Sequence, residues 1–210
     1  MTQVKICGLS TAETMQTALD KGADMIGLVF YPKSPRNVSL EQAAALAAQA
    51  RGRAKIVALT VDADDALLKL IANAARPDFL QAHGSETPSR VAEITAKFGI
   101  PVIKAIKVKE AGDVASAKAF KDVAAMCLFD AKAPEDLLPG GNGLSFDWNL
   151  LKGKDGQFML SGGLNPENVA QAIRLTHAPI VDVSSGVEFT PGKKDIALIA
   201  KFIAAAKAAS

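Results

Sequence analysis

Short apolar runs alternate with helical segments along the whole chain, and this alternation restricts the possible folds more than any other feature. The runs have the length and the β-branched content of strands that are buried on both faces. They are Val4–Cys7, Met25–Val29, Lys55–Val61, Phe79–Gln81, Val102–Ile106, Met126–Phe129, Phe158–Leu160 and Ile180–Val183. The sequence therefore predicts eight strands.

Segments with helical spacing lie between these strands. Ser10–Glu13 and Ser39–Gln42 have the pattern of capping boxes, and Asn165 followed by Pro166 indicates a further helix start. Other helical stretches are Asp64–Ala75, Ser89–Phe98, Ala111–Phe120, Val169–Leu175 and Ile196–Ala208, while Phe146–Leu151 allows at most one short helix. Eight units without an interior break predict an α/β fold closed into a (β/α)8 TIM barrel. An open, doubly wound sheet is the structural alternative.

Length and composition predict one barrel domain over residues 1–210, close to the short end for this architecture. The net charge of +2 gives no electrostatic footprint for a polyanion, so neither nucleic acid nor a membrane surface is an expected partner. Cys7 and Cys127 lie in apolar runs and form no CxxC pair, which favours a reducing cytoplasm. The N-terminus enters a strand pattern directly and no apolar run has the length of a membrane span, so cytoplasmic localisation is expected.

Glycine and serine gather in the segments that follow the last three predicted strands. These segments are Gly140–Gly143, Ser161–Gly163 and Ser184–Gly186. In a parallel barrel they lie on one face, where glycine lets backbone N–H groups approach a phosphate closely. Tight turns would explain any single glycine loop. Their occurrence after both the seventh and the eighth strand predicts a phosphorylated small-molecule substrate.

Cys7 and Asp130 come at the ends of the first and sixth predicted strands, so their side chains are expected on this same face. A thiol and a carboxylate that face each other across the barrel mouth have the geometry of a general base and a general acid. A neighbouring lysine such as Lys5 would favour the thiolate. The alternatives are a small buried cysteine and an aspartate on a surface loop.

Arg36 and His83 are candidate substrate-binding residues. Arg36 ends the segment Tyr31–Arg36, whose prolines stiffen the chain, and its forked donors suit a carboxylate. A solvated surface arginine is the alternative. His83 follows the fourth strand and is expected to hydrogen-bond substrate, whereas His177, at a helix end, is expected to be structural. Neither histidine has a second ligand at metal-binding spacing, so no metal site is predicted.

Blocks spread over nearly the whole chain resemble the phosphoribosylanthranilate isomerase family. They are Val4–Leu9, Gly27–Phe30 with Ser34–Arg36, Gln81–Gly84, Phe129–Asp130, Gly141–Gly143 with Phe146–Trp148, Ser161–Pro166 and Asp182–Glu188. The first and last blocks are individually specific. The chain departs from the family pattern at Ala82, where leucine is common, and at Leu144–Ser145, which replaces a commoner polar pair in the sixth loop, a loop expected to influence substrate affinity.

The resemblance implies a barrel of the ribulose-phosphate-binding type and an Amadori rearrangement in tryptophan biosynthesis. N-(5-phosphoribosyl)anthranilate would become 1-(2-carboxyphenylamino)-1-deoxyribulose 5-phosphate. By this similarity Asp130 is the general acid that protonates the ring oxygen, and Cys7 is the general base that removes the proton from C2. The other implied roles are phosphate binding by Gly162, Gly163, Ser185 and Gly186, carboxylate binding by Arg36, and pocket lining by His83 and Asp182.

No metal or organic cofactor is expected, because the iminium nitrogen of the opened sugar is itself the electron sink. The expected assembly is a monomer or a homodimer. Two other functions remain open: a histidine-pathway or dual-substrate sugar-phosphate isomerase, and a non-catalytic barrel that binds a phosphorylated ligand. The first would have an aspartate at the position of Cys7 and a second phosphate site. The second would bind without turnover and would leave the pairing of Cys7 with Asp130 unexplained.

Overall fold

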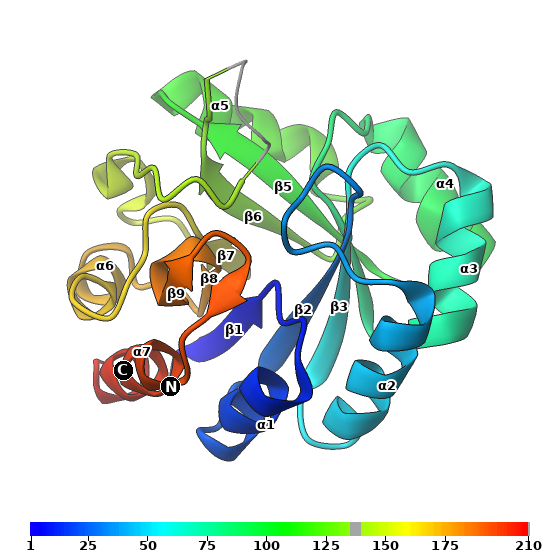
Figure 1. Ribbon diagram of the computed structural model, residues 1–210. Helices are drawn as coiled ribbons and strands as arrows, with labels where there is room; N and C mark the ends of the chain where they lie inside the picture. Colours follow the sequence, from blue (N-terminus) through cyan, green and yellow to red (C-terminus); the bar gives the residue numbers. More distant parts are fainter. Residues whose placement is uncertain (135–139, 210) are drawn as a thin grey trace.

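Eight parallel strands close into a barrel in the order of the sequence (Figure 1). The computed structural model describes residues 1–134 and 140–209. The strands are β1 (Gln3–Cys7), β2 (Met25–Phe30), β3 (Lys55–Thr60), β4 (Phe79–Ala82), β5 (Val102–Val108), β6 (Met126–Ala131), β7 (Phe158–Leu160) and β8 (Ile180–Val183). The predicted fold class, a closed (β/α)8 barrel, is therefore confirmed, and the open sheet is excluded.

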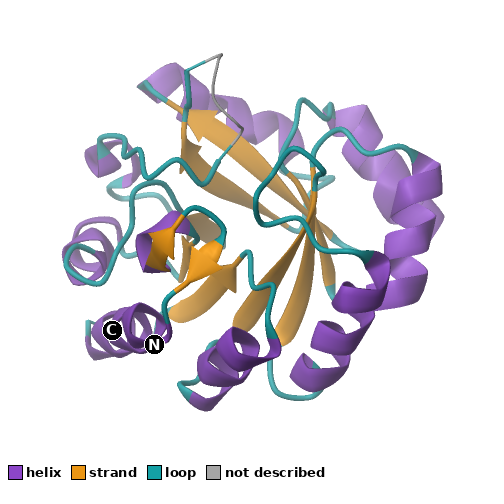
Figure 2. Ribbon diagram, in the orientation of Figure 1, coloured by secondary structure: helices purple, strands orange, loops and turns teal. Residues whose placement is uncertain are grey.

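Helices form a ring outside the strands (Figure 2). They are α1 (Ala12–Asp20), α2 (Leu40–Ala50), α3 (Asp65–Ala75), α4 (Pro88–Phe98), α5 (Ala111–Ser116), α6 (Val169–Thr176) and α7 (Ile196–Ala208), with the 3-10 helices η1 (Ala117–Phe120), η2 (Trp148–Leu151) and η3 (Ser185–Val187). Their inner faces pack apolar side chains such as Met15, Ile71 and Phe202 against the strands. None of the helices in the described part of the chain is long and apolar enough to cross a membrane.

The barrel closes where the first strand pairs with the last. β1 and β8 are parallel, and Lys5 is in register with Asp182. Lys5 is fully buried, and its Nζ lies 2.8 Å from Oδ1 of Asp182. Because a buried ammonium needs a counter-charge, this ion pair is a condition for closing the barrel in this register.

Several predicted element boundaries differ from the structure. The N-cap of α1 is Thr11, which accepts a hydrogen bond from Thr14 N, so the predicted capping box at Ser10–Glu13 is wrong, whereas that at Ser39–Gln42 is confirmed. Asn165 and Pro166 form a turn, and α6 begins only at Val169. The predicted helix Ala111–Phe120 is divided into α5 and η1, because the hydrogen bonding tightens after Ser116.

A small antiparallel hairpin after β8 has no counterpart among the predicted elements. Its strands are β9 (Glu188–Thr190) and β10 (Lys193–Lys194). The predicted sixth strand also ended too early, since β6 continues through Asp130 to Ala131. Asp130 is thus a residue of the barrel strand itself, and its backbone is held by hydrogen bonds to β5.

Candidate active site

A cavity lies at the C-terminal ends of the strands. One part of its wall is apolar and includes Val29, Tyr31, Leu59 and Val61. The other part is polar, and it contains five of the candidate residues: Cys7, Arg36, His83, Asp130 and Asp182. Residues from β1, β4, β6, β8 and the loop after β2 thus converge on one cavity, as the sequence analysis predicted for this face.

Cys7 is the last residue of β1 and is in register with Gly27 on β2. A Cβ at Gly27 would lie 2.8 Å from the Cys7 Sγ, so glycine is required there to leave room for the thiol. Burial raises the pKa of the Cys7 thiol above its ordinary value, although the positive charges of Lys5 and Lys194 oppose this shift. The expectation that Lys5 would favour the thiolate is correct in sign, but burial outweighs it because Lys5 is also paired with Asp182.

Asp130 belongs to a chain of buried polar side chains. Its Oδ2 lies 3.2 Å from Nε2 of His83, and Nδ1 of His83 lies 2.9 Å from Nε2 of Gln81. Its Oδ1 accepts a hydrogen bond from Ala131 N at 3.0 Å. His83 therefore contacts the proposed general acid directly, which its position after β4 did not reveal.

Asp182 faces the cavity, but both of its carboxylate oxygens are engaged within the protein. Oδ1 pairs with Lys5, and Oδ2 lies 3.2 Å from the Ser161 hydroxyl, which donates to it. Asp182 thus lines the pocket as expected while serving first as the counter-charge of a buried lysine.

A second cavity adjoins the first and is lined by the loops after β6, β7 and β8. Gly162, Gly163 and Ser185 lie in its wall, as do Gly140–Gly143. Gly162 and Gly163 have φ values of +84° and +69°, a left-handed conformation that favours glycine. Gly186 packs against the carbonyl of Leu164, where an added Cβ would lie only 1.9 Å from the oxygen.

The substitution Gly186→Ala should therefore force the loops after β7 and β8 apart. We expect a KM increase of about tenfold or more, from lost phosphate binding, with a smaller change in kcat. Steady-state kinetics, together with inhibition by inorganic phosphate, would measure this. Gly112→Ala is the matched control, because an added Cβ at Gly112 has only Glu110 Oε1 nearby, at 3.9 Å. An unchanged KM in Gly186→Ala would contradict a phosphate site between these loops.

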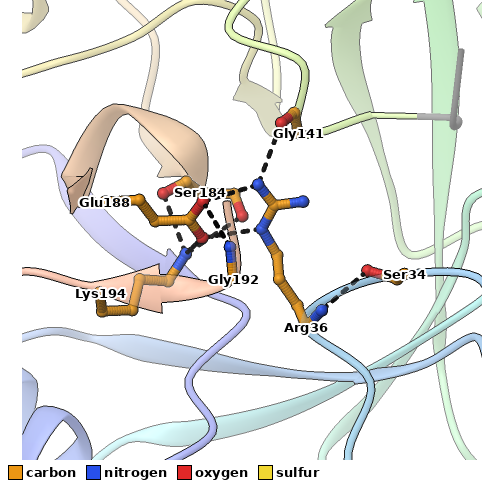
Figure 3. Close-up of polar contacts among 7 residues, drawn as sticks. All are labelled: Ser34, Arg36, Gly141, Ser184, Glu188, Gly192 and Lys194. Carbon is orange, nitrogen blue, oxygen red and sulfur yellow. Dashed lines mark hydrogen bonds and ion pairs between the residues drawn. The ribbon is translucent and has the colours of Figure 1, made fainter. Parts of the chain in front are cut away.

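Arg36 reaches from the loop after β2 to the hairpin after β8, and its guanidinium meets Glu188 there (Figure 3). Arg36 Nε and NH2 each donate to one Glu188 oxygen at 2.8 Å, and NH2 also donates to the carbonyl of Gly141 at 3.0 Å. The fork that was expected to hold a substrate carboxylate is thus occupied on one edge by Glu188. The NH1 nitrogen makes no hydrogen bond within the described part of the chain.

Glu188 joins Arg36 to a second buried cation, Lys194. Nζ of Lys194 donates to Glu188 Oε1 at 2.6 Å and to the carbonyl of Ser184 at 2.9 Å (Figure 3). Burial tends to raise the pKa of the Glu188 carboxyl, but the hydrogen bonds and charges of Arg36 and Lys194 hold that pKa below its ordinary value. Burial lowers the pKa of Lys194 despite the nearby carboxylate.

Glu188, Lys194 and Gln81 are site residues that the sequence analysis did not single out as such. The only signal available was that Glu188 and Gln81 fall within blocks of the family resemblance. Within the described residues, no cluster of three or more His, Cys, Asp or Glu side chains has the arrangement of a metal site.

Comparisons with known proteins agree with this geometry. The family model described as N-(5'-phosphoribosyl)anthranilate (PRA) isomerase matches residues 4–205. The isomerase of that name from Bradyrhizobium sp. (strain ORS 278) is 53% identical over 209 residues, covering 98% of this chain and 95% of the relative.

Solved structures give the same result. Phosphoribosyl anthranilate isomerase from Thermotoga maritima has a TM-score of 0.89 at 36% identity, covering 99% of this chain and 100% of that one. A second structure, with a TM-score of 0.86 at 34% identity and the same coverage, is a complex of such an isomerase with reduced 1-(o-carboxyphenylamino)-1-deoxyribulose 5-phosphate. A third, with a TM-score of 0.85 at 34% identity and the same coverage, contains monomers generated from the dimeric Thermotoga maritima isomerase.

Proposed function

Because the chain belongs to the N-(5'-phosphoribosyl)anthranilate isomerase family, we propose that its barrel mouth carries out that isomerisation in tryptophan biosynthesis, with Asp130 and Cys7 as acid and base. The observation that carries this assignment of roles is the convergence of Cys7, Asp130 and Arg36 on one cavity that adjoins the glycine-rich loops. The substrate has a phosphate, a sugar and an aromatic carboxylate, and the two cavities offer matching surfaces in that order.

The proposed reaction begins at Asp130. Its carboxylic acid gives a proton to the ring oxygen while the bond from C1 to that oxygen breaks, and the bonding electrons stay on the oxygen. The Cys7 thiolate then removes the proton from C2, and the electron pair moves through C1 to the iminium nitrogen, giving an enolamine. The enol hydroxyl loses its proton to Asp130, and C1 gains the proton held by Cys7, which yields the ketone and restores both groups.

In this scheme the positive charge of the iminium compensates for the buried position of Cys7. Burial makes a thiolate unfavourable in the free enzyme, whereas a cation formed next to Sγ stabilises it. The thiolate is thus most populated after ring opening, when the C2 proton has become acidic.

Arg36 is proposed to bind the anthranilate carboxylate through its NH1 side, since Glu188 occupies the opposite edge of the guanidinium. Val29, Tyr31, Leu59 and Val61 offer an apolar surface for the aromatic ring. The glycine-rich loops, with Gly162, Gly163, Ser185 and Gly186, are proposed to hold the phosphate.

Arg36→Ala should raise KM by about ten- to a hundredfold and change kcat much less, because a carboxylate held equally in ground and transition states contributes only to binding. Glu188 keeps Lys194 as a partner in this variant, so its buried carboxylate is not left unpaired. Arg53→Ala, which removes a surface pair with Asp20, is the control. An unchanged KM in Arg36→Ala would remove Arg36 from substrate binding.

We further propose that residues 1–210 form one domain, that the enzyme acts in the cytoplasm as a monomer or homodimer, and that no cofactor is required. The two unpaired cysteines and the place of the reaction in amino-acid biosynthesis support the cytoplasm. The dimeric relative supports a homodimer as one of the two states.

A direct conversion assay tests the function. Purified protein, supplied with N-(5-phosphoribosyl)anthranilate generated in place, should form the carboxyphenylamino-deoxyribulose phosphate in buffer that contains a chelator. Loss of activity with the chelator, and its recovery with one particular metal ion, would contradict a cofactor-free mechanism. Binding of the product analogue without any turnover would instead favour a non-catalytic barrel.

A further inference from the structure

We propose that Gln81 and His83 are a positioning pair for Asp130, and that the Gln81 amide changes its orientation to serve the carboxyl group in both of its protonation states. This inference rests on the proposed function, because it takes Asp130 as the proton donor. Gln81 is given a role exerted through His83, the hydrogen-bond partner that lies between it and Asp130.

The three side chains form a buried row across the barrel mouth. Gln81 is fully buried on β4, and His83 and Asp130 are 4% and 6% exposed. The contacts run from Gln81 Nε2 to His83 Nδ1, and from His83 Nε2 to Asp130 Oδ2. Water has little access to this row, so the protein itself must satisfy each donor and acceptor.

The orientation of the amide determines which nitrogen of the imidazole carries the proton. When the Gln81 amide nitrogen donates to Nδ1, a neutral His83 has its proton on Nε2 and donates it to Asp130. This arrangement fits the carboxylate that remains after Asp130 has given its proton to substrate. The same arrangement is wrong for a carboxylic acid at Asp130, because two donors would then face each other.

When Asp130 is protonated, the imidazole proton of His83 must lie on the opposite nitrogen. A protonated Asp130 donates to Nε2, so the imidazole proton sits on Nδ1 and needs an acceptor. Rotating the Gln81 amide by half a turn places Oε1 there. The change moves one imidazole proton from Nε2 to Nδ1 by exchange with a water in the cavity, whose wall includes both Gln81 and His83, so the proton count of His83 is unchanged.

With its amide nitrogen toward His83, Gln81 has one buried polar atom whose hydrogen bonding is unsatisfied. Gln81 Oε1 is buried and has no hydrogen-bond partner among the described residues. Leaving a buried carbonyl unsatisfied is costly, and such groups are rare in native structures. A purely structural glutamine would gain from a partner for each half of its amide, whereas an amide that alternates between two orientations always leaves one half free.

The surroundings hold the row rigid apart from this amide. His83 N donates to the carbonyl of Thr60, and Lys104 Nζ donates to the carbonyl of Gly84 and to Glu86 in the loop that follows. Gly140 covers the contact from the other side, where an added Cβ would lie 2.8 Å from Nε2 of His83. The imidazole is therefore fixed in place while its proton can change position.

Kinetics of two Gln81 variants and one control variant test the pair. Gln81→Met removes both halves of the amide at similar size, and Gln81→Glu retains an acceptor only. Each should lower kcat by about tenfold and leave KM within about twofold, because the acid is affected and substrate binding is not. Gln3→Met, at the exposed start of β1, is the control for the substitution itself. Wild-type kcat in Gln81→Glu would show that one amide orientation suffices, and it would overturn the proposal.

A double-variant comparison separates this inference from the proposed function. Gln81→Met should not lower kcat further in an Asp130→Asn background, since Gln81 acts through Asp130. If Asp130→Asn itself retained wild-type turnover, the proposed acid would be wrong. If Asp130→Asn were inactive while Gln81→Met matched the wild type, only the positioning role would be wrong.

Nitrogen-15 NMR of the imidazoles supplies a readout that a merely structural glutamine would not move. The chain has only two histidines, and His177→Gln assigns the signals of the other. In the wild type His83 should show one protonated and one bare nitrogen, and in Gln81→Met the two shifts should move toward their average. Gln81→Glu should place the proton on Nδ1. Identical spectra in all three proteins would overturn the proposal.

Discussion

Replacing Cys7 by serine should lower kcat by at least about a hundredfold, the usual cost of losing a general base. The hydroxyl keeps the shape of the thiol over Gly27 but is a far weaker acid, so almost none of it ionises near neutral pH. Steady-state assays of purified variants would measure the loss. Cys127→Ser, a change in β6 away from the cavity residues, is the control and should keep wild-type activity.

The rate of alkylation measures how the reactivity of the Cys7 thiol depends on pH. Because burial raises the pKa of Cys7, less thiolate is present at any given pH than in an ordinary thiol. Inactivation by an alkylating reagent should thus accelerate with rising pH and show no plateau below the ordinary thiol pKa, and a phosphate-bearing product analogue should block it. Burial also raises the pKa of Cys127, which lies outside the cavity, so its modification should be slow and should not be blocked by the analogue. Near-wild-type turnover of Cys7→Ser with a lower melting temperature would make Cys7 a core residue and refute the mechanism.

Replacing Asp130 by asparagine should also lower kcat by at least about a hundredfold, because the amide cannot protonate the ring oxygen. The amide matches the carboxyl in size and can still meet His83 Nε2 and Ala131 N, so the fold should be preserved. Circular dichroism and thermal melting would check this, and Asp155→Asn on the surface is the control.

The double variant Cys7→Ser with Asp130→Asn should be little worse than the poorer single variant, since both groups act on one proton path. If the fall in kcat of the double variant instead equalled the product of the falls in the two single variants, Cys7 and Asp130 would act independently of each other. A burst of ring-opened intermediate in Cys7→Ser, absent in Asp130→Asn, would place the acid before the base.

The barrel was predictable because its strands are nearly continuous apolar runs between amphipathic helices. Eight such runs require eight buried strands, whatever the details at their ends. The ends of helices were less predictable where two neighbouring residues could each serve as the N-cap. Ser10 and Thr11 are both good N-caps, and in the structure Thr11 has this role. Glu188–Thr190 and Lys193–Lys194 are too short and too polar to indicate a hairpin by pattern.

The site was predictable only in part, for a physical reason. Glycines and the strand-end residues Cys7 and Asp130 mark the correct face, because all strands of a parallel barrel end there. Contacts between distant segments leave no local pattern. Arg36 and Glu188 are 152 residues apart, and the sequence gives no sign that one would occupy the fork of the other. The same holds for His83 and Asp130, which meet only because the loop after β4 faces β6.

Closure of the barrel through Lys5 and Asp182 has a consequence for how the protein is made. β1 leaves the ribosome before the other strands of the barrel, and Asp182 on its partner β8 follows 177 residues after Lys5. At about 5 to 20 residues per second, translation separates the two by roughly 10 to 35 s. Throughout that interval the Lys5 ammonium has no counter-ion and cannot be buried, so the edge of β1 stays open and the Cys7 side of the mouth is unformed. For most of its synthesis the chain therefore lacks the pairing of β1 with β8, and chaperone contact in this period would protect the unpaired edge from aggregation.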